Sequence, residues 1–344
     1  MRAAVLREYR QPLSLEDVPD PSCPSDGVVL RTIACGICRS DWHGWSGEHP
    51  RVRPGQIQGH EYCGEVVEAG PDSSWKVGDR LVAPFILACG RCPACQSGHQ
   101  NTCPSQRLPG FVEPGAFAEY VPVPYDHNLA RLPDGLDPTI AAGLGCRVTT
   151  SWHALTGRAA LQAGEWLAVH GTGGVGLSAA LLGRALGARV VVVDVVRAKL
   201  DHALGLGIDA AVMADGDTAA RIREITGGGA HVSVEALGIP ATVEASIRCL
   251  RPLGRHVQVG MPVGHTARME VDMNAVYMGN LALYGTRGMP SWRYPSLLGM
   301  ITSGQVDMAP LVARTVALSD ASAELAAFDG PTPPGVAVIV DFGR

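Results

Sequence analysis

The stretch WLAVHGTGGVGLSAALLGRALGARVVVVD, residues 166–194, decides the fold of the middle part of this chain. It opens with a short apolar run at 166–170, continues as GTGGVG at 171–176, and passes into a helix-length stretch. A G-x-G-x-x-G pattern between a strand and a helix lets a dinucleotide pyrophosphate approach the helix N-terminus closely. A glycine-rich turn in some other α/β protein is the alternative. We predict that the dinucleotide-binding residues are Gly171, Gly173, Gly174, Val175 and Gly176.

Asp194 ends the next apolar run and lies eighteen residues after Gly176. A carboxylate at this position can accept hydrogen bonds from the adenosine ribose, and it would repel a 2′-phosphate. The sequence therefore favours NAD over NADP. Arg197 and Lys199 follow closely and keep NADP open, and we retain Lys199 as a candidate cofactor contact.

The alternation of apolar runs and helix-length stretches extends over residues 147–287. Continuous apolar runs are typical of parallel strands buried on both faces, and their alternation with helices is typical of βαβ units. Before residue 147, short β-like runs such as 27–32 and 64–68 are broken by glycine and proline. We therefore predict an α/β protein with a compact β-rich domain and a doubly wound sheet. The last strand, at 335–341, is expected to rejoin the first domain.

Composition limits the class of protein. A chain of 344 residues is long enough for two domains, and its net charge of −5 with scattered basic residues argues against nucleic-acid binding. No apolar run reaches the ~18–20 residues that cross a bilayer, and the N-terminus lacks the pattern of a secretory signal. We expect a cytoplasmic protein with no membrane partner, in which clustered cysteines hold metal instead of forming disulfides.

Four cysteines occur within fifteen residues, at Cys89, Cys92, Cys95 and Cys103. The two-residue gaps allow successive thiolates to surround one ion, and a closed four-cysteine site is typical of structural zinc. An iron–sulfur cluster uses the same donors, but no neighbouring motif indicates electron transfer. Unliganded cysteines on a glycine-rich loop are the remaining alternative. We interpret the cluster as a structural zinc site.

A second metal site is suggested by two local segments, CGICRSDWH at 35–43 and GHEYCG at 59–64. A catalytic zinc needs about three protein ligands and one open position. Cys38, His60 and the distant Cys146 carry donor atoms that suit such a site.

The segment GHEYCG with the later Gly70 resembles the zinc signature of the medium-chain alcohol dehydrogenase family. Other motifs of that family occur in order: GICRSD at 36–41, the four-cysteine segment, Gly145-Cys146, and the glycine pattern at 171–176. The resemblance thus covers nearly the whole chain. It implies a GroES-like β-rich catalytic domain of residues 1–147 with 288–344, and a Rossmann NAD-binding domain of residues 148–287.

The resemblance implies two zinc ions per chain, the catalytic one held by Cys38, His60 and Cys146. Glu61 is then an alternating or second-sphere ligand, and Asp41 fixes the tautomer of His60.

The resemblance also implies roles around the cofactor and the substrate. Ser40 would pass the substrate proton through the nicotinamide ribose towards His43. Arg39 is expected at the pyrophosphate, Thr150 behind the nicotinamide ring, and Phe85 in the wall of the substrate pocket.

The implied activity is reversible hydride transfer between NAD and a primary or secondary alcohol, aldehyde or ketone, by way of a zinc-bound alkoxide. A polyol dehydrogenase, or a specialised dehydrogenase of aryl or terpenoid alcohols, is the alternative within the family. A non-catalytic binding or sensor protein that keeps the fold is the alternative outside it. The short catalytic domain is more similar to tetrameric microbial members, so we expect a homotetramer, with a dimer as second choice.

Two positions depart from the family pattern. The strand at 335–338 lacks an arginine that some members direct at the cofactor phosphates, and Arg147 stands where several relatives have a small residue. We expect the side chain of Arg147 to shape the nicotinamide pocket.

Several remaining side chains are interpreted as structural. A redox role for the C-x-x-C of Cys35 and Cys38 is a weaker alternative to metal binding. His49 is interpreted as an exposed loop residue, with a place at the mouth of the substrate pocket as the weaker alternative. His99 and His153 are interpreted as structural or surface residues. Four cysteines are expected to be small buried hydrophobic residues: Cys23, Cys35, Cys63 and Cys249.

Overall fold

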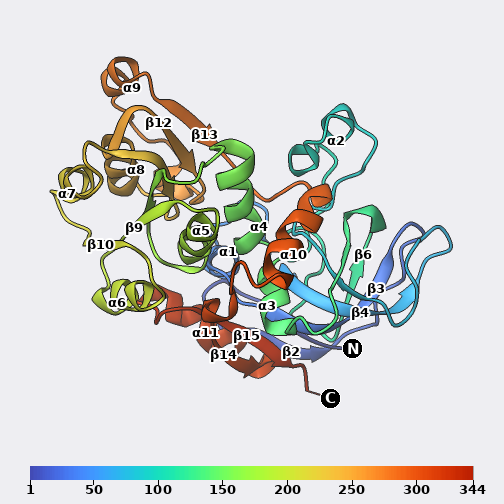
Figure 1. Cartoon of the computed structure of the whole chain (residues 1–344). Helices are drawn as coiled ribbons and strands as arrows, with labels where there is room; N and C mark the ends of the chain where they lie inside the picture. The colour runs from blue at the N-terminus through green and yellow to red at the C-terminus, as the bar shows by residue number, and fades with distance from the viewer. Residues whose placement is uncertain (344) are drawn as a thin grey trace.

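A six-stranded parallel sheet forms the core of one lobe in the computed structural model, which describes residues 1–343 (Figure 1). Its strands run in the order β10-β9-β8-β11-β12-β13, and every neighbouring pair is parallel. Numbered from β8, this is the 3-2-1-4-5-6 order of a doubly wound dinucleotide-binding fold. The predicted doubly wound sheet is therefore confirmed. Its strands are β8 (Trp166–His170), β9 (Arg189–Asp194), β10 (Ala210–Met213), β11 (Ala230–Glu235), β12 (Leu250–Gln258) and β13 (Ala282–Gly285).

The central strand β8 shows why the apolar runs are continuous. Leu167 and Val169 point into the large core that this lobe shares with its neighbour, whereas Trp166 and Ala168 point into a second core on the other face. Both faces of the sheet are thus covered, as in βαβ proteins. The covering helices are α5 (Gly174–Ala185), α6 (Arg197–Gly205), α7 (Thr218–Ile225) and α8 (Pro240–Arg248). The same lobe carries α9 (Met273–Gly279), which has no buried residue, and the short η4 (Gly264–Ala267).

The other lobe contains a seven-stranded, mostly antiparallel sheet. The C-terminal β15 lies antiparallel to β3, with Val338 opposite Gly36, so the last strand does rejoin the first part of the chain (Figure 1). A separate antiparallel pair is formed by β1 (Arg2–Val5) and β2 (Ser14–Asp17). The strands of the larger sheet are β14 (Val312–Ala317), β15 (Val336–Asp341), β3 (Val28–Gly36), β4 (Glu61–Ala69), β5 (Arg80–Val82) and β7 (Ala130–Arg131), with β6 (Tyr120–Val123) paired to β3.

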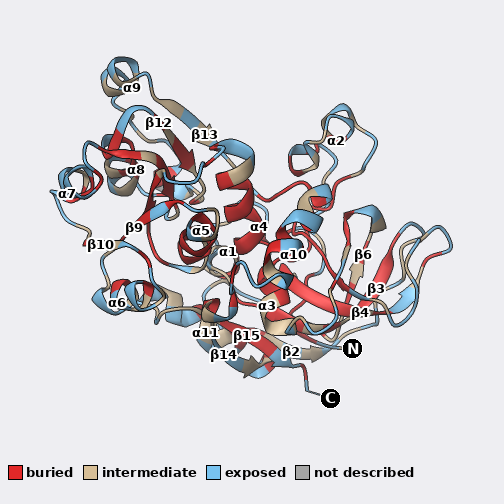
Figure 2. Cartoon of the chain, viewed as in Figure 1, coloured by how far each residue is buried: buried red, intermediate tan, exposed pale blue. Residues whose placement is uncertain are grey.

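The remaining helices are short, and two of them, α1 and α4, begin directly after residues of the candidate site. Figure 2 shows α4 and α5 as largely buried, whereas α6 and α9 present exposed faces at the periphery. None of the helices in the described part of the chain is long and apolar enough to cross a bilayer. The remaining α-helices are α1 (Arg39–Trp45), α2 (Pro93–Gln96), α3 (Pro138–Gly143), α4 (Arg147–Trp152), α10 (Tyr294–Thr302) and α11 (Ala321–Ala326). A π-helical turn follows α4 at η3 (His153–Arg158), and the other 3-10 turns are η1 (Gln100–Thr102), η2 (Asp126–Asn128), η5 (Ser291–Arg293), η6 (Ala309–Leu311), η7 (Leu318–Asp320) and η8 (Ala327–Asp329).

The turn between β8 and α5 yields a test of the fold. A Cβ atom added at Gly176 would lie 1.7 Å from the carbonyl oxygen of Gly171, whereas one added at Gly173 would meet nothing within 4 Å. We expect Gly176→Ala to lower the free energy of unfolding by about 1–3 kcal/mol or more, because a backbone atom must move. Gly173→Ala is the matched control and should unfold at the wild-type urea midpoint. Equal midpoints for the two variants would contradict this packing.

Candidate active site

Three segments that are distant in sequence bring potential metal ligands together. Cys38 caps α1 after strand β3, His60 directly precedes β4, and Cys146 caps α4. One ligand atom from each of these residues and one from Glu61 all lie within 4.8 Å of one another. The structure therefore places the three predicted ligands, and Glu61, in one cluster.

His60 is held in a defined orientation by Asp41. The distance from His60 Nδ1 to Asp41 Oδ1 is 2.8 Å, and both side chains are fully buried. Asp41 also accepts a hydrogen bond from the Cys38 backbone N–H through Oδ2, at 2.9 Å. This leaves His60 Nε2 on the side of the thiols, buried and without a hydrogen-bond partner among the described residues. A buried unpaired imidazole nitrogen beside two thiols fits a zinc ion in composition and in geometry.

The two thiols of this cluster are not equivalent. The Cys146 thiol donates to Cys38, which lowers the pKa of the Cys38 thiol well below its usual range, and His60 adds to this effect. The same interaction raises the pKa of Cys146 well above its usual range. A negative sulfur is thus stabilised at Cys38, and a thiolate is the form that binds metal.

Within the cluster, Glu61 forms an ion pair with Arg147. Glu61 Oε1 accepts hydrogen bonds from the backbone N–H and the Nε of Arg147, both at 3.0 Å, and Oε2 accepts one from Nη2. The side chains are 0% and 2% exposed, so the ion pair is buried. Arg147 does not line the active-site cavity described below. Its guanidinium binds Glu61, and its Cδ lies next to Gly174 of the glycine-rich turn, so the role expected for Arg147 at the nicotinamide pocket stays a prediction.

A cavity of about 970 Å³ opens beside the ligand cluster and lies between the two lobes. Residues of the lobe with the antiparallel sheet and residues of the parallel-sheet lobe both line it. Phe85 lies edge-on to His60, with ring centroids 5.9 Å apart. Thr150 is buried on α4, and its Oγ1 has no hydrogen-bond partner within the described residues. The predicted residues that line the cavity are Cys38, Arg39, Ser40, His43, His60, Phe85, Cys146, Thr150 and Val175.

The predicted proton-relay residues lie on α1. The Cys38 thiol is 3.9 Å from Ser40 Oγ, and His43 lies farther along the helix with its Nδ1 2.9 Å from Glu48 Oε2. Burial lowers the pKa of His43 even though Glu48 opposes the shift. A neutral His43 at neutral pH is able to accept a proton.

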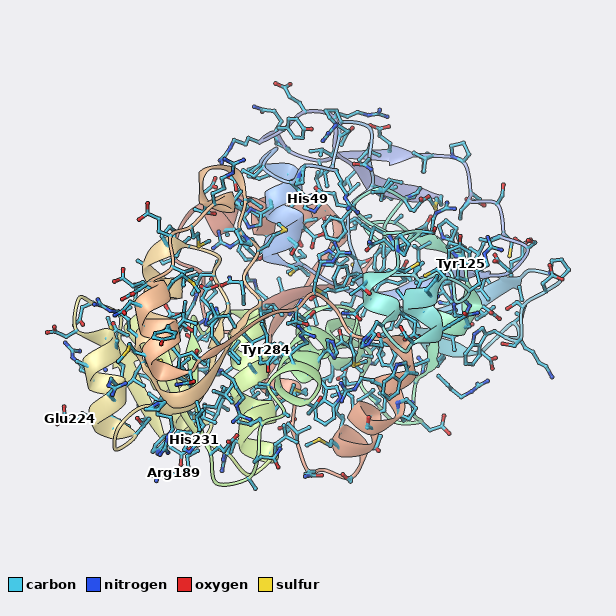
Figure 3. All side chains as sticks on the ribbon, turned by 90° about the horizontal axis from the view of Figure 1, so that it is seen from above. His49, Tyr125, Arg189, Glu224, His231 and Tyr284 are labelled. Atoms are coloured by element: carbon cyan, nitrogen blue, oxygen red, sulfur yellow. The ribbon has the colours of Figure 1, made fainter. Side chains whose placement is uncertain are left out.

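Three histidines, His49, His99 and His153, line the cavity. His153 is buried and His99 is exposed, as their interpretation as structural or surface residues expects. His49 lies beside α1, where its backbone N–H donates to the His43 carbonyl at 2.8 Å, and Figure 3 labels it there. The interpretation of His49 as an exposed loop residue is wrong, because the loop turns back and stacks the ring on Phe111 with centroids 4.7 Å apart.

The glycine-rich turn has the shape that a dinucleotide requires. Gly171 has φ +91°, and the position of a Cβ on Gly173 is open, which leaves the N-terminus of α5 accessible. Gly174 lies where an added Cβ would be 3.2 Å from Arg147 Cδ. Gly176 packs against Gly171, as the close helix–strand approach of this motif demands.

Asp194 ends β9 and contacts the glycine-rich turn, and Lys199 follows it in α6. Asp194 Oδ2 accepts hydrogen bonds from the backbone N–H and the hydroxyl of Thr172, at 2.8 and 2.7 Å. Its Oδ1 accepts one from the Val196 N–H at 3.0 Å. Lys199 donates to Thr332 Oγ1 at 3.0 Å, and burial lowers its pKa although Asp194 opposes the shift. The carboxylate is thus oriented by backbone donors.

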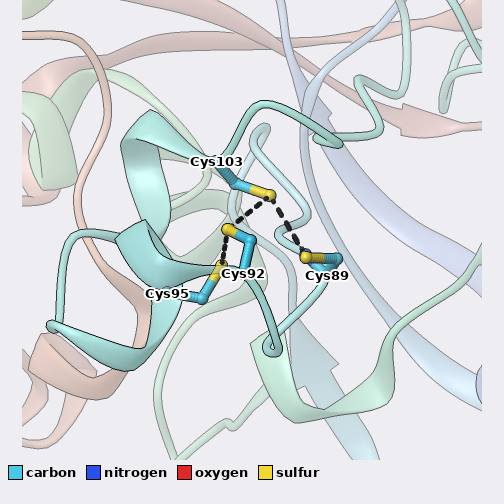
Figure 4. Close-up of side chains that lie close together, drawn as sticks. All are labelled: Cys89, Cys92, Cys95 and Cys103. Carbon is cyan, nitrogen blue, oxygen red and sulfur yellow. Dashed lines mark hydrogen bonds between the residues drawn. The ribbon is translucent and has the colours of Figure 1, made fainter.

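The four-cysteine segment folds into a separate small lobe around α2. Adjacent sulfur atoms lie 3.4–3.8 Å apart, and one sulfur from each cysteine falls within the same 4.8 Å cluster (Figure 4). Backbone N–H groups, that of Arg91 first, lower the pKa of Cys89 to about 6. These four donors match a closed tetrahedral zinc site.

The interpretation of the other cysteines is largely confirmed. Cys35, Cys63 and Cys249 are buried, whereas Cys23 is partly exposed.

Several cavity residues were not recognised in the sequence. Phe111 packs against His60 with centroids 4.5 Å apart, and Arg51 and Arg287 line the same cavity. No local motif marks these positions, because their loops reach the cavity only through tertiary packing. For Arg51, its nearness to the His49–Pro50 turn was the one available signal.

Comparison with known proteins identifies both halves of the chain. The family model described as "Alcohol dehydrogenase GroES-like domain" matches residues 24–134, and the one described as "Zinc-binding dehydrogenase" matches residues 174–303. An alcohol dehydrogenase of Geobacillus stearothermophilus is 36% identical over 266 residues, which are 76% of this chain and 78% of the relative. An L-threonine 3-dehydrogenase of Streptomyces avermitilis is 30% identical over 99% of each chain.

Solved structures agree with this assignment. The alcohol dehydrogenase TADH from Thermus sp. ATN1 superposes with a TM-score of 0.90 at 27% identity, covering 99% of this chain and 100% of that one. The predicted combination of a GroES-like domain and a Rossmann-type domain is confirmed. The chain belongs to the zinc-type medium-chain alcohol dehydrogenase family.

Proposed function

We propose that this protein is a zinc-dependent, NAD-dependent alcohol dehydrogenase that interconverts an alcohol with its aldehyde or ketone. The observation that carries the proposal is the cluster of Cys38, His60 and Cys146 at the wall of the interlobe cavity. The glycine turn of the dinucleotide fold belongs to the facing lobe. Residues that would hold a Lewis-acid metal and residues of the lobe that would hold a hydride acceptor thus line one cavity.

The chemistry divides between the bound groups and the chain. Zinc, when bound, polarises the substrate oxygen, and the nicotinamide accepts the hydride. Cys38, His60 and Cys146 would hold the metal, and Asp41 keeps His60 in the required tautomer. Ser40 and His43 would take up the substrate proton from the cavity side of α1. Glu61 acts as a second-sphere residue, because Arg147 engages both of its oxygen atoms.

The cofactor contacts are proposed from the same geometry. Arg39 would meet the pyrophosphate, and Thr150 would support the nicotinamide ring. NAD is preferred to NADP because the Asp194 carboxylate, oriented by Thr172, would repel a 2′-phosphate. Lys199 contributes a positive charge close to Asp194.

A second zinc ion is proposed for the cysteine lobe, held by Cys89, Cys92, Cys95 and Cys103. We further propose the domain division into residues 1–147 with 288–344 and residues 148–287. The pairing of β15 with β3 supports this division. A cytoplasmic location is in keeping with ten cysteines that form no disulfide.

The direct test is the initial rate of NADH formation across primary, secondary, benzylic, terpenoid and polyol alcohols, with NAD and with NADP. Turnover with NAD supports the proposal, and the ranking separates a simple alcohol dehydrogenase from a polyol or aryl enzyme. Binding of zinc and NAD without turnover of any alcohol would favour a binding protein.

Loss of one metal ligand should separate chemistry from cofactor binding. Cys38→Ser is expected to lower kcat by more than the about 10–100-fold that loss of a metal's outer partner costs, and to halve the zinc content. NAD affinity, measured by calorimetry, should remain. Cys23→Ser is the control, because Cys23 lies outside both clusters. Loss of NAD binding in a folded Cys38→Ser protein would count against these roles.

The relay predicts a specific pH dependence. His43 must be neutral to accept a proton, and its pKa is lowered from 6.5, so alcohol oxidation should fall only below that pH. Glu48 raises the pKa of His43, so Glu48→Gln should move the acid limb of kcat/KM to lower pH. His43→Gln should lose this limb. An acid limb that is unchanged in both variants would remove His43 from the proton path.

A homotetramer is proposed for the assembly, with a dimer as the alternative. Apolar side chains of α9 are strongly exposed, with Met273 at 62%, Tyr277 at 78% and Met278 at 69%. They lie near β13, which pairs only with β12 among the described strands. A second copy would cover both features by a two-fold contact. Sedimentation of Tyr277→Glu with Met278→Glu should show a smaller species than wild type, and an unchanged tetramer would exclude this surface.

A further inference from the structure

Two arginines that line the active-site cavity have no acidic partner among the described residues. Arg51 and Arg287 both line the cavity, and both are exposed. Neither forms an ion pair with any carboxylate of residues 1–343. The nearby Glu48 is bound to His43 and lies within 3.9 Å of Arg10. Positive charge therefore collects where the two arginines line the cavity.

The two guanidinium groups are close enough to affect each other. Desolvation in the cavity lowers the pKa of Arg287, and the charge of Arg51 lowers it further. Like charges placed together without a counter-ion repel, and a bound anion would relieve that repulsion. Two guanidinium groups are also the donors that proteins use to hold carboxylates and phosphates.

Aromatic rings lie between these arginines and the zinc-ligand candidate His60: Phe85 on the Arg287 side, and His49 and Phe111 on the Arg51 side. The Arg287 guanidinium carbon is 5.8 Å from the centroid of Phe85, whose ring faces His60. Arg51 is two residues after His49, which stacks on Phe111, and Phe111 in turn packs against His60. A substrate whose hydroxyl reaches the metal side would thus extend past an aromatic wall and end between the arginines.

The cysteine lobe fixes the position of Arg287. Asn101 Nδ2 donates to the Arg287 carbonyl at 3.0 Å, and Arg287 Nη2 donates to Gln106 Oε1. Asn101 lies in the turn just before Cys103, so the folded cysteine cluster supports the loop that carries the arginine. Arg51 is held by its backbone N–H, which donates to His49 Nδ1 at 3.3 Å. These hydrogen bonds hold the loops that carry the two arginines, so the positions of both residues are defined before a ligand binds.

We propose that Arg51 and Arg287 form an anion subsite, so that the preferred substrate is an alcohol that carries a carboxylate or phosphate beyond a short spacer. This rests on the proposed dehydrogenase function and names its substrate class. The anion is held by charge-assisted hydrogen bonds at one end of the cavity, while the hydroxyl lies at the other end beside Cys38 and Ser40.

The test compares an acid with its neutral analogue. In the zinc-loaded enzyme with NAD, kcat/KM is measured for para-hydroxymethylbenzoate, for its amide, and for para-hydroxymethylphenyl phosphate. We expect the anions to be preferred over the amide about tenfold or more, and the larger of the two values distinguishes carboxylate from phosphate. Arg51→Gln and Arg287→Gln should each lower kcat/KM for the preferred anion about tenfold to a hundredfold, mainly through KM, and leave the amide unchanged.

Control variants and a binding measurement keep the two proposals separable. Arg248→Gln removes an exposed arginine of α8 that is paired with Glu244, and it should behave as wild type. Lysine at either cavity position should restore part of the preference. Calorimetric titration of para-toluate, which has no hydroxyl, should show binding to the wild type that either glutamine variant weakens. Equal use of acid and amide by the wild type, or para-toluate binding unchanged in both variants, would overturn the subsite. Absence of turnover with every alcohol would count against the dehydrogenase function, while the para-toluate titration would still decide the subsite.

Discussion

The meeting of Cys38, His60 and Cys146 within 4.8 Å is the constraint on which the rest of the molecule depends. Each residue stands at the end of a regular element, where backbone direction is fixed by hydrogen bonding: a cap of α1, the start of β4 and a cap of α4. The register of the sheet therefore sets the relative positions of the ligand residues. Gly36 is paired with Glu61 across β3 and β4. Cys38 follows Gly36 by two residues and His60 directly precedes Glu61, so this pairing brings Cys38 and His60 together.

Burial around the site has an electrostatic consequence. The cluster concentrates thiol, imidazole and carboxylate groups where water is excluded, and unpaired charges there would be costly. Asp41 forms an ion pair with His60, and Glu61 forms one with Arg147, so both buried carboxylates at this cluster have a partner. The guanidinium also lies close to Gly174 of the glycine-rich turn, so the cluster of candidate ligands and the parallel-sheet lobe share one packed region.

The cavity differs in character between its two ends. On the cofactor side it is formed by small and apolar residues of the parallel-sheet lobe, which suits a flat ring. On the outer side it is polar and basic, with histidines and two arginines carried by loops. Loops positioned by a rigid scaffold are the usual place for specificity, whereas the metal cluster rests on the scaffold itself. The cysteine lobe stabilises one of these loops through Asn101.

The sequence by itself determined the features that depend on local spacing. The glycine pattern before α5, the continuous apolar runs of the parallel strands, and the spacing of Cys89 to Cys103 each specify a local geometry. Their order along the chain then pointed to the three distant ligands. Only the tertiary structure decided where long side chains go. Arg147 binds Glu61, His49 lies against the cavity, and Arg51 and Arg287 line the same cavity, because packing between distant segments, and not their spacing, sets those positions.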